Sequence, residues 1–192
     1  MRWKLTISSP GGHRSEFRCV ASTLYQAVDK LRSAVHSLDL DQALQLPHIE
    51  LRQLKNLHNQ EGIKDIAQIA MMVHALRARQ HILEPSGLPN IKILLDDAGD
   101  WLLFDGHHTV LAYLLAGYRE VNEVPCLILY VDSVSGRVPS DAIRVVFGQH
   151  AKDVTNWRDF AINWQAPVEN QLTSKKQQTM GELVDVIRPF VQ

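Results

Sequence analysis

The stretch LLFDGHHTVLAYLLAGYREV, residues 102–121, carries most of the information about this chain. A short apolar run ends at Asp105-Gly106-His107-His108, and apolar residues at helical spacing follow at once. This pattern predicts a strand that becomes a helix near Gly106. An acid, a glycine and two adjacent imidazoles at such a junction require a chemical explanation.

Each residue of the junction suits a phosphate group. We expect Asp105 to cap the helix, with its carboxylate accepting the amide proton of His107 or His108. Gly106 leaves the backbone open to a ligand, and the amides and positive dipole end at a helix start favour an anion. Both imidazoles can donate to phosphate oxygens, and they gain charge below roughly pH 6.5. The alternative is a plain capped helix with one buried and one exposed histidine.

Hydrophobic periodicity around the junction predicts a mixed α/β fold. The expected elements are a β-hairpin followed by a helix that starts after Ser22-Thr23, a strand at 48–54, a helix at 62–80, a hairpin at 91–104, the helix from Gly106, and a strand at 124–131 that is buried on both faces. Gly117 stands where a helix-ending glycine is expected.

Composition limits the class of protein. The chain is 45% hydrophobic and 21% charged, as is usual for soluble globular proteins. No apolar stretch approaches the roughly 20 residues needed to cross a bilayer, and the first residues lack the apolar core of a signal peptide. Cys19 and Cys126 match no zinc or redox spacing. We therefore expect a cytoplasmic protein with two idle or buried thiols and no contact with a membrane.

Charge by segment argues against nucleic acid as the partner. Residues 1–45 have a net charge of +2, residues 46–135 of −4 and residues 136–192 of +1. Binding to duplex DNA needs a basic face that releases counterions from the phosphates, and the sequence shows no such block. DDAGD, residues 96–100, indicates hairpin turn chemistry rather than a metal cluster, so no metal site is predicted in the protein itself.

LLFDGHHTVLAYLLAGYREVNEVPCLI resembles the signature of the ParB/sulfiredoxin superfamily. There a strand enters a glycine-centred phosphate-binding motif, and a stretch of the type A-x-x-L-A-G-x-x-x-V-P-x-x-I/V follows; AYLLAGYREVNEVPCLIL fits it with a short insertion. The resemblance spans residues 46–133. It implies a ParB/sulfiredoxin-like core at 46–135, between an N-terminal ββα extension (1–45) and a C-terminal helical extension (136–192) packed on the core.

The motif is nearest to one branch of that superfamily. Sulfiredoxins resemble F-G-G-C-H-R here, and this chain has histidine where their reactive cysteine stands, so the thiolate chemistry is unavailable. Partition proteins resemble G-E-R-R and need a helix-turn-helix, which the remaining 59 residues do not supply. The D-G-H-H-R of archaeal free-serine kinases and other ParB-like relatives matches best. Thr109 replaces its arginine, which removes a bidentate phosphate ligand and implies weaker phosphate binding or a different ligand.

The resemblance implies a ligand and a chemistry. The implied ligand is ATP or ADP with Mg²⁺, or a small phosphorylated molecule. In the serine kinases a glutamate in the loop after the entry strand is the general base, and the matching loop here offers His58 or Glu61. Glu61 suits equally well a role as a first-turn acid of the next helix. The implied phosphate site is formed by Asp105, Gly106, His107, His108 and Thr109.

Three functions remain open from the sequence. The leading hypothesis is a small-molecule phosphotransferase, or kinase, that uses the turn at residues 105–109. The second is a nucleotide-responsive binding module without catalysis, in which the phosphate site switches a protein partner. The third is a ParB-like nuclease or DNA-partition-related protein, against which the acidic segment at 46–135 counts.

Overall fold

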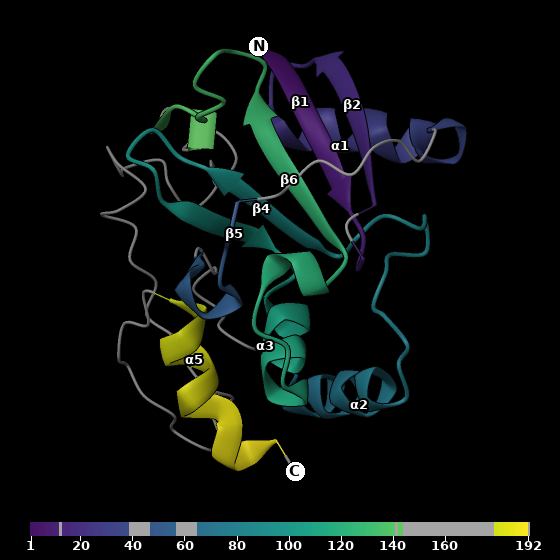
Figure 1. Cartoon of the computed structure of the whole chain (residues 1–192), viewed down its shortest axis with the longest axis vertical. Coiled ribbons are helices and arrows are strands. Elements are labelled where there is room, and N and C mark those ends of the chain that lie inside the picture. Colours follow the sequence, from purple (N-terminus) through teal and green to yellow (C-terminus); the bar gives the residue numbers. More distant parts are fainter. Residues whose placement is uncertain (12, 39–46, 57–64, 141, 144–178, 192) are drawn as a thin grey trace.

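The computed structural model describes residues 1–11, 13–38, 47–56, 65–140, 142–143 and 179–191, which form six strands and four α-helices (Figure 1). The strands are β1 (Arg2–Ser8), β2 (Arg14–Val20), β3 (Lys55–Asn56), β4 (Ile91–Leu95), β5 (Trp101–Asp105) and β6 (Cys126–Val131). The α-helices are α1 (Leu24–Ala34), α2 (Ile66–Arg77), α3 (His107–Ala116) and α5 (Met180–Ile187), and short 3-10 turns include η2 (Leu51–Gln53) and η6 (Arg188–Phe190). None of the described helices has the length and apolarity that crossing a bilayer requires. The mixed α/β class predicted from the sequence is confirmed.

All six strands belong to one mixed sheet, in the order β2-β1-β6-β4-β5-β3 (Figure 1). β1 pairs antiparallel with β2 and with β6, and β4 pairs antiparallel with β5. β6 runs parallel to β4, and β3 runs parallel to β5. The N-terminal hairpin therefore extends the sheet that ends in the β5–α3 junction.

Helices lie on both faces of this sheet. Along β6, Cys126 and Ile128 belong to the hydrophobic core shared with α2, α3 and α5, while Leu127 and Leu129 belong to the core shared with α1. Because successive side chains of a strand point to opposite faces, the alternation shows that β6 is covered on both sides. The prediction of a strand buried on both faces is confirmed.

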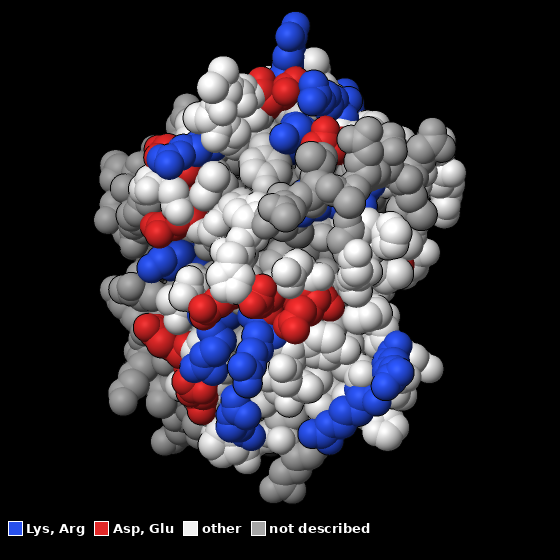
Figure 2. Space-filling view, in the orientation of Figure 1, with Lys and Arg blue, Asp and Glu red and all other residues white. Residues whose placement is uncertain are grey.

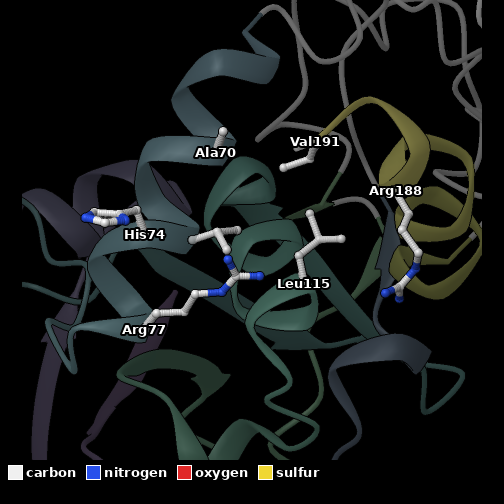
Figure 3. A pocket seen from close by; sticks show the side chains of 7 residues that line it. Ala70, His74, Arg77, Leu115, Arg188 and Val191 are labelled. Atoms are coloured by element: carbon white, nitrogen blue, oxygen red, sulfur yellow. The ribbon is translucent and has the colours of Figure 1, made fainter.

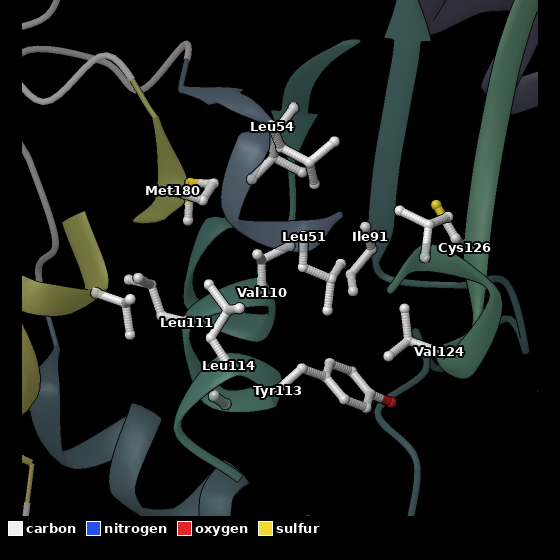
Figure 4. Close-up of a cluster of buried hydrophobic side chains, with 14 of the residues drawn as sticks. Leu51, Leu54, Ile91, Val110, Leu111, Tyr113, Leu114, Val124, Cys126 and Met180 are labelled. Carbon is white, nitrogen blue, oxygen red and sulfur yellow. The ribbon is translucent and has the colours of Figure 1, made fainter. Parts of the chain in front are cut away.

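The helix α3 is the centre of the larger core. Seven of its ten residues are buried, as expected for a helix that is apolar on most sides and packed on most sides. Its side chains meet residues of η2, β4 and α5, including Leu51, Ile91 and Met180 (Figure 4). The Tyr113 hydroxyl accepts a hydrogen bond from the Ile82 amide at 3.2 Å, and this contact fastens the chain between α2 and β4 to α3.

Most of the predicted elements are present. The N-terminal hairpin, the helix that Thr23 caps, the 91–104 hairpin and the helix start after Gly106 are confirmed. The helix expected at 62–80 is described from Ile66, where the Asp65 side chain accepts the Gln68 amide. The apolar spacing of this helix predicts that Met71 lies in or near the core, but Met71 is 68% exposed, so this prediction is wrong.

The strand predicted at residues 48–54 is also wrong. The segment contains one isolated bridge at Glu50, and then the η2 turn. Leu51 and Leu54 are both fully buried in the core around α3. Residues three apart share one face of a helical turn but point to opposite faces of a strand. Burial of both leucines on one side therefore favours the turn.

Two glycines with positive φ bound α3, and their surroundings differ. Gly106 has a φ of 88°, and a Cβ there would lie 2.5 Å from the carbonyl oxygen of Asn90. Gly117 has a φ of 100° with nothing within 4 Å of a Cβ; its amide and that of Tyr118 donate to carbonyls of the last turn, as expected for a helix-ending glycine. Both sites favour glycine for backbone reasons, and Gly106 also needs it for packing.

Gly106→Ala and Gly117→Ala form a matched pair that tests this close approach. Gly117→Ala should lower the free energy of unfolding by about 1–2 kcal/mol, the cost of a left-handed L-residue. Gly106→Ala adds a clash with the start of β4 and should cost on the order of 2 kcal/mol more. Urea denaturation of both variants measures the difference, and equal losses would show that the backbones are not this close in solution.

Candidate functional site

The β5–α3 junction places Asp105 differently from the sequence prediction. The N-cap residue of α3 is Gly106, and no side-chain hydrogen bond caps this helix. The Asp105 carboxylate instead accepts the Gly106 amide at 2.9 Å and the Lys92 ammonium at 2.7 Å. The expected capping of His107 or His108 by Asp105 is therefore wrong.

A β-bulge explains where the Asp105 side chain goes. Lys92 pairs in register with Asp105 and Ile93 with Leu103, so two residues of β5 oppose one residue of β4. Such a bulge re-aims the side chains beyond it. Phe104 lies in the core on the α1 side of the sheet, and Asp105 joins Lys92 on that side rather than continuing the alternation.

Gly106 has a packing role that the sequence did not reveal. We expected its missing side chain to leave room for a ligand, but the group that occupies this space is the backbone of Asn90 and Ile91. The same Asn90 donates its side-chain amide to the Thr109 hydroxyl at 2.6 Å. Asn90, which lies just before β4, therefore contacts the start of α3 twice, through its backbone and through its side chain.

The two histidines and the threonine of the motif lie at different depths. His107 is 8% exposed, His108 is partly buried, and the Nε2 atoms of both rings are buried. Thr109 is fully buried, with its hydroxyl 3.9 Å from the Met72 sulfur and bonded to Asn90. An arginine could not take the place of Thr109 without bringing a charge into the core. Threonine in place of the arginine of the resembled motif is therefore consistent with the burial of this position.

A buried ion network beside the junction was missed in the sequence. Lys92 is 1% exposed, and its ammonium lies 2.6 Å from Glu84 and 2.7 Å from Asp105. Glu84 also accepts two hydrogen bonds from Arg32 of α1, at 3.1 and 3.3 Å. A lysine inside the apolar strand IKILL was a usable signal, because a buried charge needs a partner. The identity of that partner depends on the tertiary fold.

The network controls the ionisation of Glu84. Burial by itself would raise the pKa of this carboxyl, but hydrogen bonds from Arg32 and Lys92 and their charges together lower the pKa to about 2. On α1, burial raises the pKa of Tyr25, and the nearby charge of Asp105 adds to the effect. The first turn of α1 therefore faces the Asp105 carboxylate across the network.

The remaining candidates are placed as follows. His58 and Glu61, the predicted general bases, lie outside the described residues. Asp96 and Asp100 close the β4–β5 turn, since the Asp100 amide donates to the Asp96 carboxylate at 2.7 Å; this confirms the turn chemistry. Cys126 is buried, and burial raises the pKa of its thiol.

The effects of substitutions at Glu84 and Lys92 on the free energy of unfolding should be strongly coupled. Glu84→Gln leaves the buried Lys92 ammonium with a single carboxylate and should lower the free energy of unfolding by about 3 kcal/mol. Adding Lys92→Met removes the orphaned charge and should recover a large part of this loss. A double-mutant cycle measures the coupling. Asp185→Asn, which breaks the exposed Arg52–Asp185 pair, is the control and should change stability by less than about 1 kcal/mol.

The same network predicts a dependence of stability on pH. The folded Glu84 has a pKa of about 2 and its reference value is 4.5, so its stabilisation is complete above pH 4.5 and is lost as the pH falls toward 2. The linked contribution is on the order of 2–3 kcal/mol. Urea denaturation from pH 7 to pH 2 should show the wild type and Glu84→Gln converging at the acid end. A constant difference between them over this range would contradict the lowered pKa.

Comparisons with known proteins add no relative. No protein-family model, no curated protein and no solved structure matches this chain. The resemblance of residues 46–133 to the ParB/sulfiredoxin superfamily stays a prediction, and the function has to be argued from the chemistry of the junction.

Proposed function

We propose that this chain binds ATP, ADP or a small phosphorylated molecule at the start of α3, on a ParB/sulfiredoxin-like core formed by residues 46–135. We further propose that it transfers a phosphoryl group to a small molecule. The observation that supports the proposal is that the parallel strands β3 and β5 finish side by side at the same end of the sheet.

The described ends of these two strands lie at the same end of the sheet as the start of α3. Asn56, the last residue of β3, is in register with Leu103 of β5, and α3 begins four residues beyond Leu103. The chain therefore leaves β3 at the end of the sheet where α3 begins, and we propose that His58 and Glu61, which follow β3 in the sequence, complete the site there. In open α/β sheets, ligands bind outside the carboxyl ends of the strands.

The start of α3 suits an anion more than a cation. The positive end of the helix dipole lies there, with His107 and His108 in the first turn. Lys92 offsets the charge of Asp105, the nearest carboxylate. The Thr109 hydroxyl is engaged with Asn90, so the phosphate ligands we propose are first-turn amides and an imidazole.

Asp105 adds a place for the metal of a nucleotide. Its side chain is 51% exposed, and Mg²⁺ in phosphoryl-transfer sites binds one or two carboxylates together with substrate phosphates. In the proposed reaction the base, His58 or Glu61, accepts the proton of an acceptor hydroxyl as that oxygen attacks the γ-phosphorus. The bond to the β-phosphate oxygen breaks, and ADP leaves.

The surface favours a small ligand over DNA. On the face shown in Figure 2, the described Asp, Glu, Lys and Arg side chains are interleaved rather than gathered into a broad basic field. Duplex binding depends on such a field. A nuclease or partition function is therefore the weaker alternative.

The proposal predicts stabilisation by nucleotides. At a nucleotide concentration 100 times the Kd, the gain is about 2.7 kcal/mol, which should raise the Tm by roughly 5–10 °C for a chain of this size. Thermal melts with ATP and with ADP, each with and without Mg²⁺, measure it. His108→Ala should weaken binding about tenfold, the effect of losing one charge-assisted contact, while the exposed His36→Ala control should not. Melts that no nucleotide shifts would contradict the proposal.

Measurement of ATP turnover distinguishes a kinase from a nucleotide-responsive binding module. A kinase converts ATP to ADP faster in the presence of its acceptor, and Glu61→Gln or His58→Ala should abolish that rate while nucleotide binding persists. Binding with no turnover across a panel of small hydroxyl compounds supports the nucleotide-responsive module instead.

A further inference from the structure

A pocket lies between α2, α3 and the chain after α5, away from the start of α3 (Figure 3). It has a volume of about 260 Å³. Leu115, which lies on its α3 side, is eight residues beyond His107, or roughly 12 Å along the helix axis at 1.5 Å per residue. The residues that line it are Ala70, Val73, His74, Arg77, Leu115, Arg188 and Val191.

The charged lining of this pocket has one sign. The Arg77 side chain extends from α2 toward Leu115, Arg188 lies on the opposite side of Leu115, and the His74 ring points away from Leu115 (Figure 3). No Asp or Glu is among the described lining residues. Within the described part of the chain, neither guanidinium makes a hydrogen bond or an ion pair, so both are available to an anion.

The α5 carboxylate whose charge interacts with that of Arg188 is engaged elsewhere. Asp185, one turn before Arg188, pairs with Arg52 at 2.6 and 3.2 Å. The hydrogen bonds from Arg52 lower the pKa of Asp185, and the charge of Arg188 adds only a smaller effect. Arg188 lines the pocket and makes no hydrogen bond or ion pair with Asp185 among the described contacts.

The rest of the lining is apolar. Val73 is 5% exposed, and Leu115 and Val191 are partly buried against the core around α3. Two forked cations above an apolar floor suit a carboxylate or phosphate group joined to a short hydrocarbon. The volume lies just below the range typical of drug-sized ligands, which indicates a small molecule.

We propose that this pocket binds a small amphipathic anion, with its carboxylate or phosphate held between Arg77 and Arg188 and its hydrocarbon lying on Val73, Leu115 and Val191. Such a ligand joins α2 to the end of the described chain and stabilises the packing of both on α3. The site is separate from the nucleotide site proposed above, and it stands whether or not the chain binds nucleotides.

Calorimetry and thermal melts with four probes test the proposal on the full chain. Octanoate and hexyl phosphate should bind and raise the Tm, and the stronger of the two identifies the preferred head group. Hexanol lacks the charge and inorganic phosphate lacks the hydrocarbon, so each should bind at least tenfold more weakly. Equal binding of hexyl phosphate and inorganic phosphate, or no binding of either amphipathic probe, would overturn the proposal.

Matched variants locate the binding. Arg77→Gln and Arg188→Gln should each weaken binding of the preferred probe about tenfold or more and leave the Tm without ligand unchanged, because both side chains are exposed. Arg79→Gln, which removes the same charge just beyond α2 outside the lining, is the control and should bind like the wild type. His108→Ala should leave probe binding intact, and Arg77→Gln should leave nucleotide binding intact. Undiminished probe binding by both pocket variants would show that the probe sits elsewhere.

Discussion

The buried ammonium of Lys92 is the constraint on which the site depends. It lies within the sheet, where a charge without partners would cost several kcal/mol. Glu84 reaches it from the chain before β4, and Asp105 reaches it across the bulge. Arg32 then ties Glu84 to α1. The pairing thus fixes three things at once: the course of the chain into β4, the direction of the Asp105 side chain and the docking of α1.

Elements whose evidence is local could be predicted from the sequence. The strand at 101–105 and the turn into α3 follow from an apolar run that ends at a glycine, and the ten residues of the helix that follows are mostly apolar. The double burial of β6 follows from its continuous apolar run. The β4–β5 hairpin follows from turn residues between two such runs. In each case the decisive pattern lies within about twenty residues.

What could not be predicted depends on pairs that are distant in sequence. The role of Gly106 is set by the backbone of Asn90, sixteen positions earlier, and the role of Thr109 by the Asn90 side chain. The bulge opposite Lys92 turns Asp105 to the α1 side, and alternation along β5 gives no sign of it. Residues 48–52 alternate as in a strand, yet Leu51 and Leu54 enter one core from one side of a turn. The pattern of side chains along the sequence identifies helices and strands, but the tertiary contacts of each residue become visible only in the packed structure.

These structural roles change how the motif at 105–109 must be understood. Asp105, Gly106 and Thr109 all hold the helix start in place, by an ion pair, a close backbone contact and a hydrogen bond. Attraction for an anion at that point then rests on backbone dipoles and imidazoles, with the Lys92 charge already matched by carboxylates. The pocket at Arg77 and Arg188 has the opposite balance, because the cationic groups among its described lining residues are arginine side chains without a described carboxylate partner. A polyphosphate gains most from several fixed amides, whereas a small organic anion gains most from forked cations over an apolar floor. The two proposed sites on α3 are therefore suited to different ligands.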